Sequence, residues 1–166
     1  GQFDDARMAI SLALTANQEG ACLINYTNVI GLTKEKDLVT GVRLIDQISG
    51  KEKTIRSKVV VNATGVFSDK IIALDQPDAK RMIRPSQGVH LVIEKSFLAG
   101  AHAIMVPHTS DGRVLFAVPW NDYVVVGTTD TPVNETLEEP VALENEIEFI
   151  LENAGAYMTK KPMRKD

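Results

Sequence analysis

A chain of 166 residues is long enough for one ordinary domain, and a hydrophobic content of 44% permits a real core. A net charge of −4 excludes the basic footprint expected of a nucleic-acid-binding protein. The sequence has no apolar run near the ~20 residues that span a membrane, and its single cysteine, Cys22, excludes an internal disulfide and fits a reducing cytoplasm.

The first segment of the chain has the pattern of a helix. Small and apolar residues recur at helical spacing from residue 3 to about residue 17. Asp4 and Asp5 lie in the first turn, where carboxylates favour the positive end of a helix, and Gly20 fits a stop. Residues 21–25 and 27–33 are predicted to be strands separated by a break.

A hairpin is predicted next, because residues 38–46 and 51–56 alternate in polarity around a Ser49-Gly50 turn. Residues 58–62 form a nearly continuous β-branched run, which is typical of a strand buried on both faces. Ala63-Thr64-Gly65 leaves this strand, and Ser68 is predicted to cap a short helix that runs through Leu74. A boundary is expected near residues 76–84.

After this boundary the sequence predicts a mostly antiparallel sheet. Four strands with turn residues between them are expected, at residues 88–94, 103–106, 113–118 and 123–127. Asp111-Gly112 and Trp120-Asn121-Asp122 supply two of the turns. Trp120 is expected to be a packing residue.

The last predicted strand ends in the polar sequence Gly127-Thr128-Thr129-Asp130. Polar groups at the end of a rigid strand often build a ligand pocket, and a satisfied surface turn is the alternative. A closing helix is predicted from residue 143 to about residue 157. Its apolar face is expected to comprise Leu143, Ile147, Ile150, Leu151 and Ala154. Glutamates that include Glu144 and Glu146 load its N-terminal end with negative charge, as the helix dipole favours.

Four blocks in a fixed order carry a family resemblance. They are GQFDDAR (residues 1–7), VNATGVFSD (61–69), RPSQGVH (84–90) and FAVPW with VVVGTTD (116–130). Together they resemble the flavin-dependent glycerol-3-phosphate dehydrogenases. Two parts of that family's pattern are missing from the sequence: the glycine-rich turn that meets the FAD diphosphate at a helix N-terminus, and an Arg-Pro pair beyond the GTTD block. The chain is therefore expected to be a middle fragment of a longer parent enzyme.

The resemblance implies a fold and an activity. The fold class is α+β or α/β, with residues 1–80 as part of an FAD-binding lobe and residues 81–166 as part of a substrate-binding lobe. The parent would oxidise sn-glycerol 3-phosphate to dihydroxyacetone phosphate, pass hydride to FAD and pass electrons on to a quinone. By the same resemblance the parent is cytoplasmic with peripheral membrane contact. The fragment alone is expected to lack FAD.

The resemblance also assigns cofactor-binding residues. Ala63, Thr64 and Gly65 resemble a segment that lies against the diphosphate and ribose, and glycine allows a close backbone approach. A tight turn that needs glycine is the alternative. Val29 matches a position that touches the adenine through its backbone, and a plain core valine is the alternative.

Three residues are candidates for catalysis and substrate binding. His90 could take the hydroxyl proton as the substrate carbon gives up hydride, or could hydrogen-bond structurally. Arg84 could bind the substrate phosphate or pair with a carboxylate. Thr129 resembles the family threonine that hydrogen-bonds the substrate, while Thr128 and Asp130 are expected to hold the turn. The three histidines lack the local spacing of a metal site, so no metal is predicted.

Two other functions remain open. A related flavin-dependent amine or 2-hydroxy-acid oxidase would share the two-lobed architecture but would bind a carboxylate in place of a phosphate. A non-catalytic binding domain is the second alternative, because a fragment without the diphosphate turn could fold and catalyse nothing.

Overall fold

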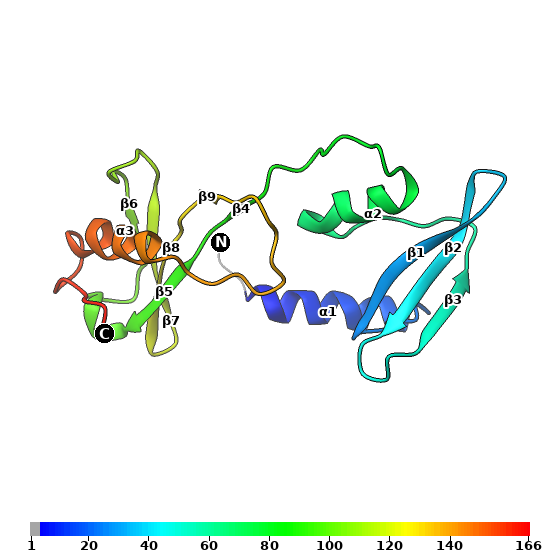
Figure 1. The fold of residues 1–166 in the computed structure, drawn as a ribbon. Helices are drawn as coiled ribbons and strands as arrows, with labels where there is room; N and C mark the ends of the chain where they lie inside the picture. Colours follow the sequence, from blue (N-terminus) through cyan, green and yellow to red (C-terminus); the bar gives the residue numbers. More distant parts are fainter. Residues whose placement is uncertain (1–3) are drawn as a thin grey trace. The chain divides into compact units, whose positions relative to one another are not determined.

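The computed structural model describes residues 4–166, which fall into two compact units, Gly1–Ala79 and Lys80–Asp166 (Figure 1). Gly1 to Phe3, with the start of the first sequence block and of the predicted first helix, lie outside the described residues. The mixture of helices and antiparallel sheets confirms the predicted α+β class.

The first unit contains two helices and one antiparallel sheet. Helix α1 (Asp5–Gln18) begins at Asp4, whose side chain accepts the N–H of Arg7 at 2.9 Å, so this aspartate is the N-cap. The sheet has the order β1–β2–β3, and a short 3₁₀ turn precedes α2. The bounds are β1 Thr27–Glu35, β2 Leu38–Asp46, β3 Glu52–Arg56, the 3₁₀ turn Gly65–Phe67 and α2 Ser68–Asp75. The predicted hairpin of β2 and β3 is confirmed.

Three local predictions in this unit are wrong. Residues 21–25 and 58–62 form no strand, and the side chains of Val59 and Val61 are 73% and 81% exposed. A strand buried on both faces needs neighbouring strands and covering layers, and the described residues provide neither for this run. Ser68 is the first residue of α2 and not its cap; its hydroxyl donates to the carbonyl of Gly65 at 2.7 Å.

The second unit is built on a four-stranded antiparallel sheet of order β5–β8–β7–β6, beside a two-stranded ladder of β4 and β9. The bounds are β4 Ser86–Gln87, β5 His90–Glu94, β6 Ile104–Val106, β7 Leu115–Trp120, β8 Tyr123–Gly127, β9 Thr131–Pro132 and α3 Glu144–Gly155. Asn121 and Asp122 join β7 to β8, and Val118 pairs with Val125 across this hairpin. The predicted hairpin is therefore confirmed.

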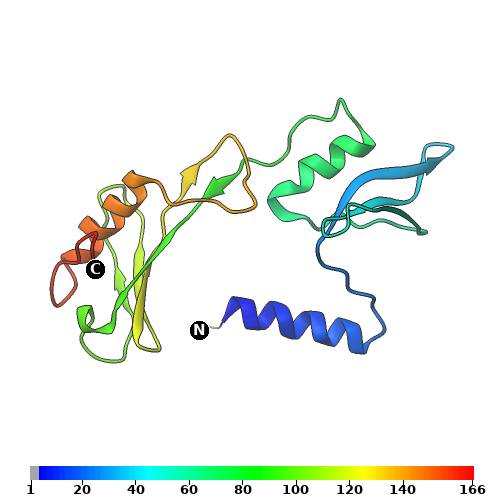
Figure 2. The same ribbon diagram turned by 60° about the horizontal axis from the view of Figure 1, so that its bottom comes forward.

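Helix α3 covers one face of this sheet (Figures 1 and 2). The core between them consists of apolar side chains from the sheet, from α3 and from the 3₁₀ turn Lys95–Phe97 and its end: Ile93, Phe97, Leu98, Val106, Leu115, Ala117, Val124, Val126, Ile150 and Ala154. Apart from Pro162, every buried apolar side chain of residues 4–166 belongs to this core. The second unit thus holds the hydrophobic core of the described chain.

The opposite face of the same sheet is open within the unit Lys80–Asp166. Strand alternation places His90 and Val92 of β5 on this face, while Leu91 and Ile93 point toward α3. Val92 is 61% exposed, Met105 58% and Phe116 48%. The sheet therefore presents a largely apolar surface with a histidine at one end of its β5 strand.

Candidate functional site

Two polar segments of the second unit come together where β4 pairs with β9. Gln87 lies opposite Thr131 in this ladder, so the RPSQGVH and GTTD blocks are adjacent. Gly88 makes the approach possible, because a Cβ at this position would lie 2.6 Å from both the Thr128 Oγ1 and the Thr129 carbonyl oxygen. The structure thus brings two of the blocks singled out in the sequence into one site.

Thr129 is buried at the centre of this site, with 3% of its surface exposed. Its hydroxyl donates to the Oε1 of Glu146 at 3.0 Å and accepts the N–H of Val89 at 3.0 Å. The hydroxyl hydrogen is therefore already engaged by a carboxylate. Thr128 donates to the Thr129 carbonyl at 3.0 Å, while Asp130 is exposed.

Glu146 gathers the polar groups of this site. Its carboxylate is 2% exposed and accepts four hydrogen bonds. The donors to Oε1 are the hydroxyls of Thr129 at 3.0 Å and Thr131 at 2.6 Å. The donors to Oε2 are the amide of Gln87 at 2.8 Å and the N–H of Leu143 at 2.9 Å. The last bond is the one that the glutamate of a capping box makes at a helix N-terminus.

The ionised form of Glu146 is stabilised in this setting. Burial is the largest single influence and raises the pKa, but hydrogen bonds from Thr131, Leu143, Gln87 and Thr129 outweigh it, so the pKa lies below its ordinary value. None of the ion pairs formed among residues 4–166 includes this carboxylate. The buried charge thus depends on neutral donors and on the positive end of α3.

His90 lies on β5 directly opposite Gly127 of β8. A Cβ at position 127 would lie 2.5 Å from the His90 Cδ2 and 2.8 Å from the Val89 carbonyl oxygen, so the close packing of this ring requires glycine. His90 is exposed on the open face of the sheet, opposite the first residue of the GTTD sequence. Its imidazole is therefore accessible to a ligand on that face.

Arg84 lies beyond the other end of the β4–β9 ladder. The carbonyl of the following Pro85 accepts the N–H of Val133 at 3.1 Å, which fixes the backbone at this point. The Arg84 side chain is exposed, and no described carboxylate forms an ion pair with it. The structure does not bring Arg84 into the Glu146 cluster.

The predicted cofactor contacts belong to the first unit. Ala63, Thr64 and Gly65 form an exposed turn in which Asn62 accepts from the Thr64 hydroxyl at 2.8 Å. Gly65 has φ +57°, and no atom lies within 4 Å of the place a Cβ would occupy. A diphosphate or ribose could therefore approach this backbone closely. Val29 on β1 is 36% exposed, so it is not a buried core valine.

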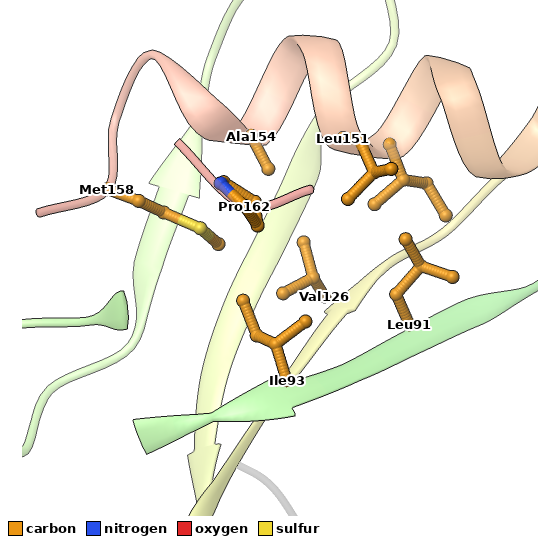
Figure 3. Close-up of a pocket in the computed structure, with 8 residues that line it drawn as sticks. Leu91, Ile93, Val126, Leu151, Ala154, Met158 and Pro162 are labelled. Atoms are coloured by element: carbon orange, nitrogen blue, oxygen red, sulfur yellow. The ribbon is translucent and has the colours of Figure 1, made fainter. Parts of the chain in front are cut away.

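An apolar crevice lies between α3 and the sheet (Figure 3). Leu151 and Ala154 of the helix face Leu91, Ile93 and Val126 of the strands. The side chains that line it offer no charged or hydrogen-bonding group for a polar substrate. The crevice belongs to the core packing and is distinct from the polar site.

The part of the chain that the structure describes has no group of three or more His, Cys, Asp or Glu side chains placed to hold a metal ion. No helix among residues 4–166 has the length and apolar composition needed to cross a bilayer.

Sequence reasoning missed Glu146 and Gln87 as members of the site. Glu146 was counted among the charges at the helix N-terminus, yet it shares the buried face of α3 with Ile150 and Ala154, four and eight residues further on. A glutamate on the apolar stripe, three residues after the N-cap Leu143, is the pattern that could have found it.

Comparisons with known proteins agree along the whole chain. Residues 1–165 match the FAD dependent oxidoreductase family. The chain is 40% identical over 165 residues to the mitochondrial glycerol-3-phosphate dehydrogenase of Homo sapiens, covering 96% of this chain and 23% of the relative. It is 40% identical over 176 residues to the enzyme of the same name from Schizosaccharomyces pombe, covering 100% of this chain and 27% of the relative. The chain thus spans about a quarter of the length of these relatives.

Two solved structures share the fold. A glycerol-3-phosphate dehydrogenase from Bacillus halodurans, complexed with FAD, superposes with a TM-score of 0.93 at 30% identity, covering 99% of this chain and 34% of that one. An L-proline dehydrogenase from P. horikoshii superposes with a TM-score of 0.66 at 20% identity, covering 90% and 37%, which indicates a shared fold alone. Since the family match covers almost every residue, the chain belongs to the FAD dependent oxidoreductase family.

Proposed function

We propose that this chain is part of an FAD-dependent glycerol-3-phosphate dehydrogenase. The enzyme would oxidise sn-glycerol 3-phosphate to dihydroxyacetone phosphate. FAD would accept the hydride from the substrate carbon and pass the electrons on to a quinone. We also propose that the enzyme contacts the surface of a membrane, because its quinone acceptor is held there.

One observation carries this proposal. Almost the whole chain superposes, with a TM-score of 0.93, on a glycerol-3-phosphate dehydrogenase complexed with FAD. The 40% identity to mitochondrial enzymes of the same name over 96% of the chain supports the same substrate. The proline dehydrogenase, at 20% identity, gives no comparable support for an amine substrate.

The two units would have different tasks. The first unit would contribute to the FAD-binding lobe, through the backbone of Ala63, Thr64 and Gly65 and through Val29. Exposure of this turn and the open space beside Gly65 fit a group that approaches the backbone. The second unit would contribute to the substrate-binding lobe.

Within the second unit we assign His90 to proton transfer. A ring nitrogen would accept the hydroxyl proton of the substrate while the carbon loses hydride. The exposed position of His90 on the open sheet face supports this role. Arg84 would bind the phosphate; the absence of a paired carboxylate among residues 4–166 leaves its guanidinium available.

Thr129 would act at the edge of the substrate site. Its single hydroxyl hydrogen points to Glu146, so a direct hydrogen bond to the substrate would use the oxygen as acceptor or would require the hydroxyl to rotate. If Thr129 contacts the substrate, its removal should lower kcat/KM; if it only holds the GTTD turn in place, its removal should lower stability.

A chimera tests the proposed function. The 166 residues would replace the matching third of the Bacillus halodurans enzyme, and FAD content and substrate oxidation would be measured with a quinone analogue as acceptor. We expect bound FAD and oxidation of sn-glycerol 3-phosphate, with no oxidation of L-proline or 2-hydroxy acids. A chimera that binds FAD but leaves sn-glycerol 3-phosphate unoxidised would contradict the proposal, and the unaltered recipient serves as control.

A further inference from the structure

Glu146 and its four hydrogen-bond donors have a feature that is not needed merely to attach α3 to the sheet. A charged carboxylate is buried without an ion pair among the described residues, and all four of its donors are neutral. Burying a charge is costly, and an apolar residue would bind α3 to the sheet without that cost. A carboxylate that accepts four hydrogen bonds can, however, hold several backbone segments in fixed positions relative to one another.

The segments that Glu146 joins are those that lead to the candidate site. Gln87 lies three residues before His90, and Thr129 lies two residues after Gly127, the partner of His90 in the sheet. From Glu146 a continuous relay passes through the Thr129 hydroxyl to the N–H of Val89, the residue next to His90. The carboxylate therefore fixes the backbone just before this histidine and the turn that follows its strand partner, Gly127.

We propose that Glu146 is a positioning residue for the reaction, which sets the His90 strand and the GTTD turn in register through Thr129. The proposal rests on the proposed function for its kinetic consequence, but its structural consequence is independent of activity. Glu146 does not face the open side of the sheet, so it acts through Thr129 and Val89 and not on the substrate.

The test compares matched variants of neighbouring glutamates. Glu146→Gln keeps the size of the side chain but removes the charge and replaces one acceptor oxygen with an NH₂ donor. Glu144→Gln is the control, because Glu144 lies in the same first turn of α3, is exposed and pairs with Arg164 at the surface. Both variants change the charge near the helix N-terminus by the same amount.

Two measurements are made on each variant. In the 166-residue chain, NMR follows the amide of Val89 and the ring of His90. In the chimera with the Bacillus halodurans enzyme, kcat and KM for sn-glycerol 3-phosphate are measured beside FAD content. For Glu146→Gln we expect shifted Val89 and His90 signals and a kcat lower on the order of 10- to 100-fold, with KM and FAD content little changed, because small misplacements of reacting groups have effects of that size.

The outcomes separate the two proposals. Glu144→Gln is expected to match the wild type in both measurements. A folded Glu146→Gln variant with unmoved Val89 and His90 signals, or with shifted signals and an unchanged kcat, would overturn the positioning role. If Glu146→Gln does not fold, Glu146→Asp, which keeps the charge but shortens the side chain, is judged by the same criteria. An inactive wild-type chimera would count against the proposed function, while the NMR comparison would still decide whether Glu146 holds the His90 strand.

Discussion

The Thr129 hydroxyl shows how one side chain can serve two segments at once. It links the carboxylate of Glu146 to the N–H of Val89, so its only hydrogen and one of its two acceptor lone pairs are used inside the protein. A threonine chosen only to contact a substrate would keep its hydrogen free. The contacts around Thr129 therefore indicate that this residue contributes more to the stability of the fold than to substrate binding.

Replacing Thr129 with valine keeps the shape but removes both hydrogen bonds. We expect the free energy of unfolding to fall by about 1.5–3 kcal/mol, because a hydrogen bond to a charged group is lost and a backbone N–H loses its acceptor. Chemical denaturation of the 166-residue chain measures this, and Thr129→Ser, which keeps the hydroxyl, should lie much closer to the wild type. Wild-type stability together with a loss of kcat/KM in the chimera would instead favour a substrate contact.

The stability of the second unit should depend on pH through Glu146. The pKa of this carboxyl is lowered in the folded state, so its contribution is complete above the ordinary glutamate pKa of about 4.3 and is lost as the pH falls through the lower, folded value. The difference in unfolding free energy between wild type and Glu146→Gln should therefore narrow in acid. Denaturation of both proteins from neutral pH downward measures it, and a constant difference would contradict the assignment.

Among the secondary-structure elements, the β4–β9 ladder depends on one glycine. A methyl group at Gly88 would meet the Thr129 carbonyl oxygen and the Thr128 hydroxyl at 2.6 Å, and the carbonyl can move only if the backbone moves. This is a close approach of two backbones, and positive φ is not needed to explain it. The GTTD turn and β4 are thus mutually dependent.

Gly88→Ala should separate these two segments. We expect a loss of about 1–3 kcal/mol in unfolding free energy, as for other overpacked sites, and a change in the Thr129 amide signal. Gly31→Ala is the matched control, because the nearest atoms to a Cβ at Gly31 on β1 lie at 3.7 Å, which is ordinary contact. Equal losses of unfolding free energy in the two variants would show that the protein accommodates a methyl group at Gly88 without a specific cost.

The sequence predicted the elements whose signals are local. Strand β8 lies at its predicted bounds, and the predicted turn Trp120-Asn121-Asp122 contains the observed turn of the β7–β8 hairpin, although Trp120 is the last residue of β7. Alternation and turn residues are both encoded within a few positions. Residues 58–62 have an equally strong β-branched pattern but no strand partner among the described residues. Pairing is a property of the neighbours, so composition alone could not decide it.

The site was only partly predictable for a similar reason. Sequence blocks located His90, Arg84 and Thr129, and their assigned roles stay predictions. The carboxylate that joins the blocks was overlooked, since a glutamate near a helix N-terminus is expected to be exposed. Its burial follows from the packing of α3 on the sheet, which places the first turn of the helix over the β4–β9 ladder.

For the molecule as a whole, the uneven distribution of the core is the main feature. The ten buried side chains of this core all lie in the unit Lys80–Asp166. The sheet of the first unit is held chiefly by backbone hydrogen bonds and surface contacts, including the Lys34–Asp75 ion pair at 2.8 Å. Such surface contacts contribute little to stability.

The two units should therefore differ in hydrogen exchange. We expect the slowest amides of the 166-residue chain in β5, β7 and β8, and rapid exchange through β1, β2 and β3, since protection follows the burial of apolar surface. Exchange followed by NMR at neutral pH measures this. Protection in the first unit equal to that in the second would contradict the conclusion that the core is the main source of stability.

The isolated chain should also purify without colour. The sequence has no glycine-rich turn at a helix N-terminus, so the main contacts expected for an FAD diphosphate are missing from these 166 residues. An absorbance scan of the purified chain over the region where flavins absorb checks this. Stoichiometric bound flavin would show that the exposed Ala63–Gly65 turn and its neighbours suffice for binding.

The spacing between Gln87 and His90 makes this region sensitive to insertions and deletions. Gln87 is held by Glu146 and cannot slide, while His90 is the first residue of β5, whose side chains alternate between the open face and the core. One extra residue between them would turn the histidine toward α3 and Leu91 toward the open face. Changes in the length of this segment should therefore be tolerated only in steps of two residues.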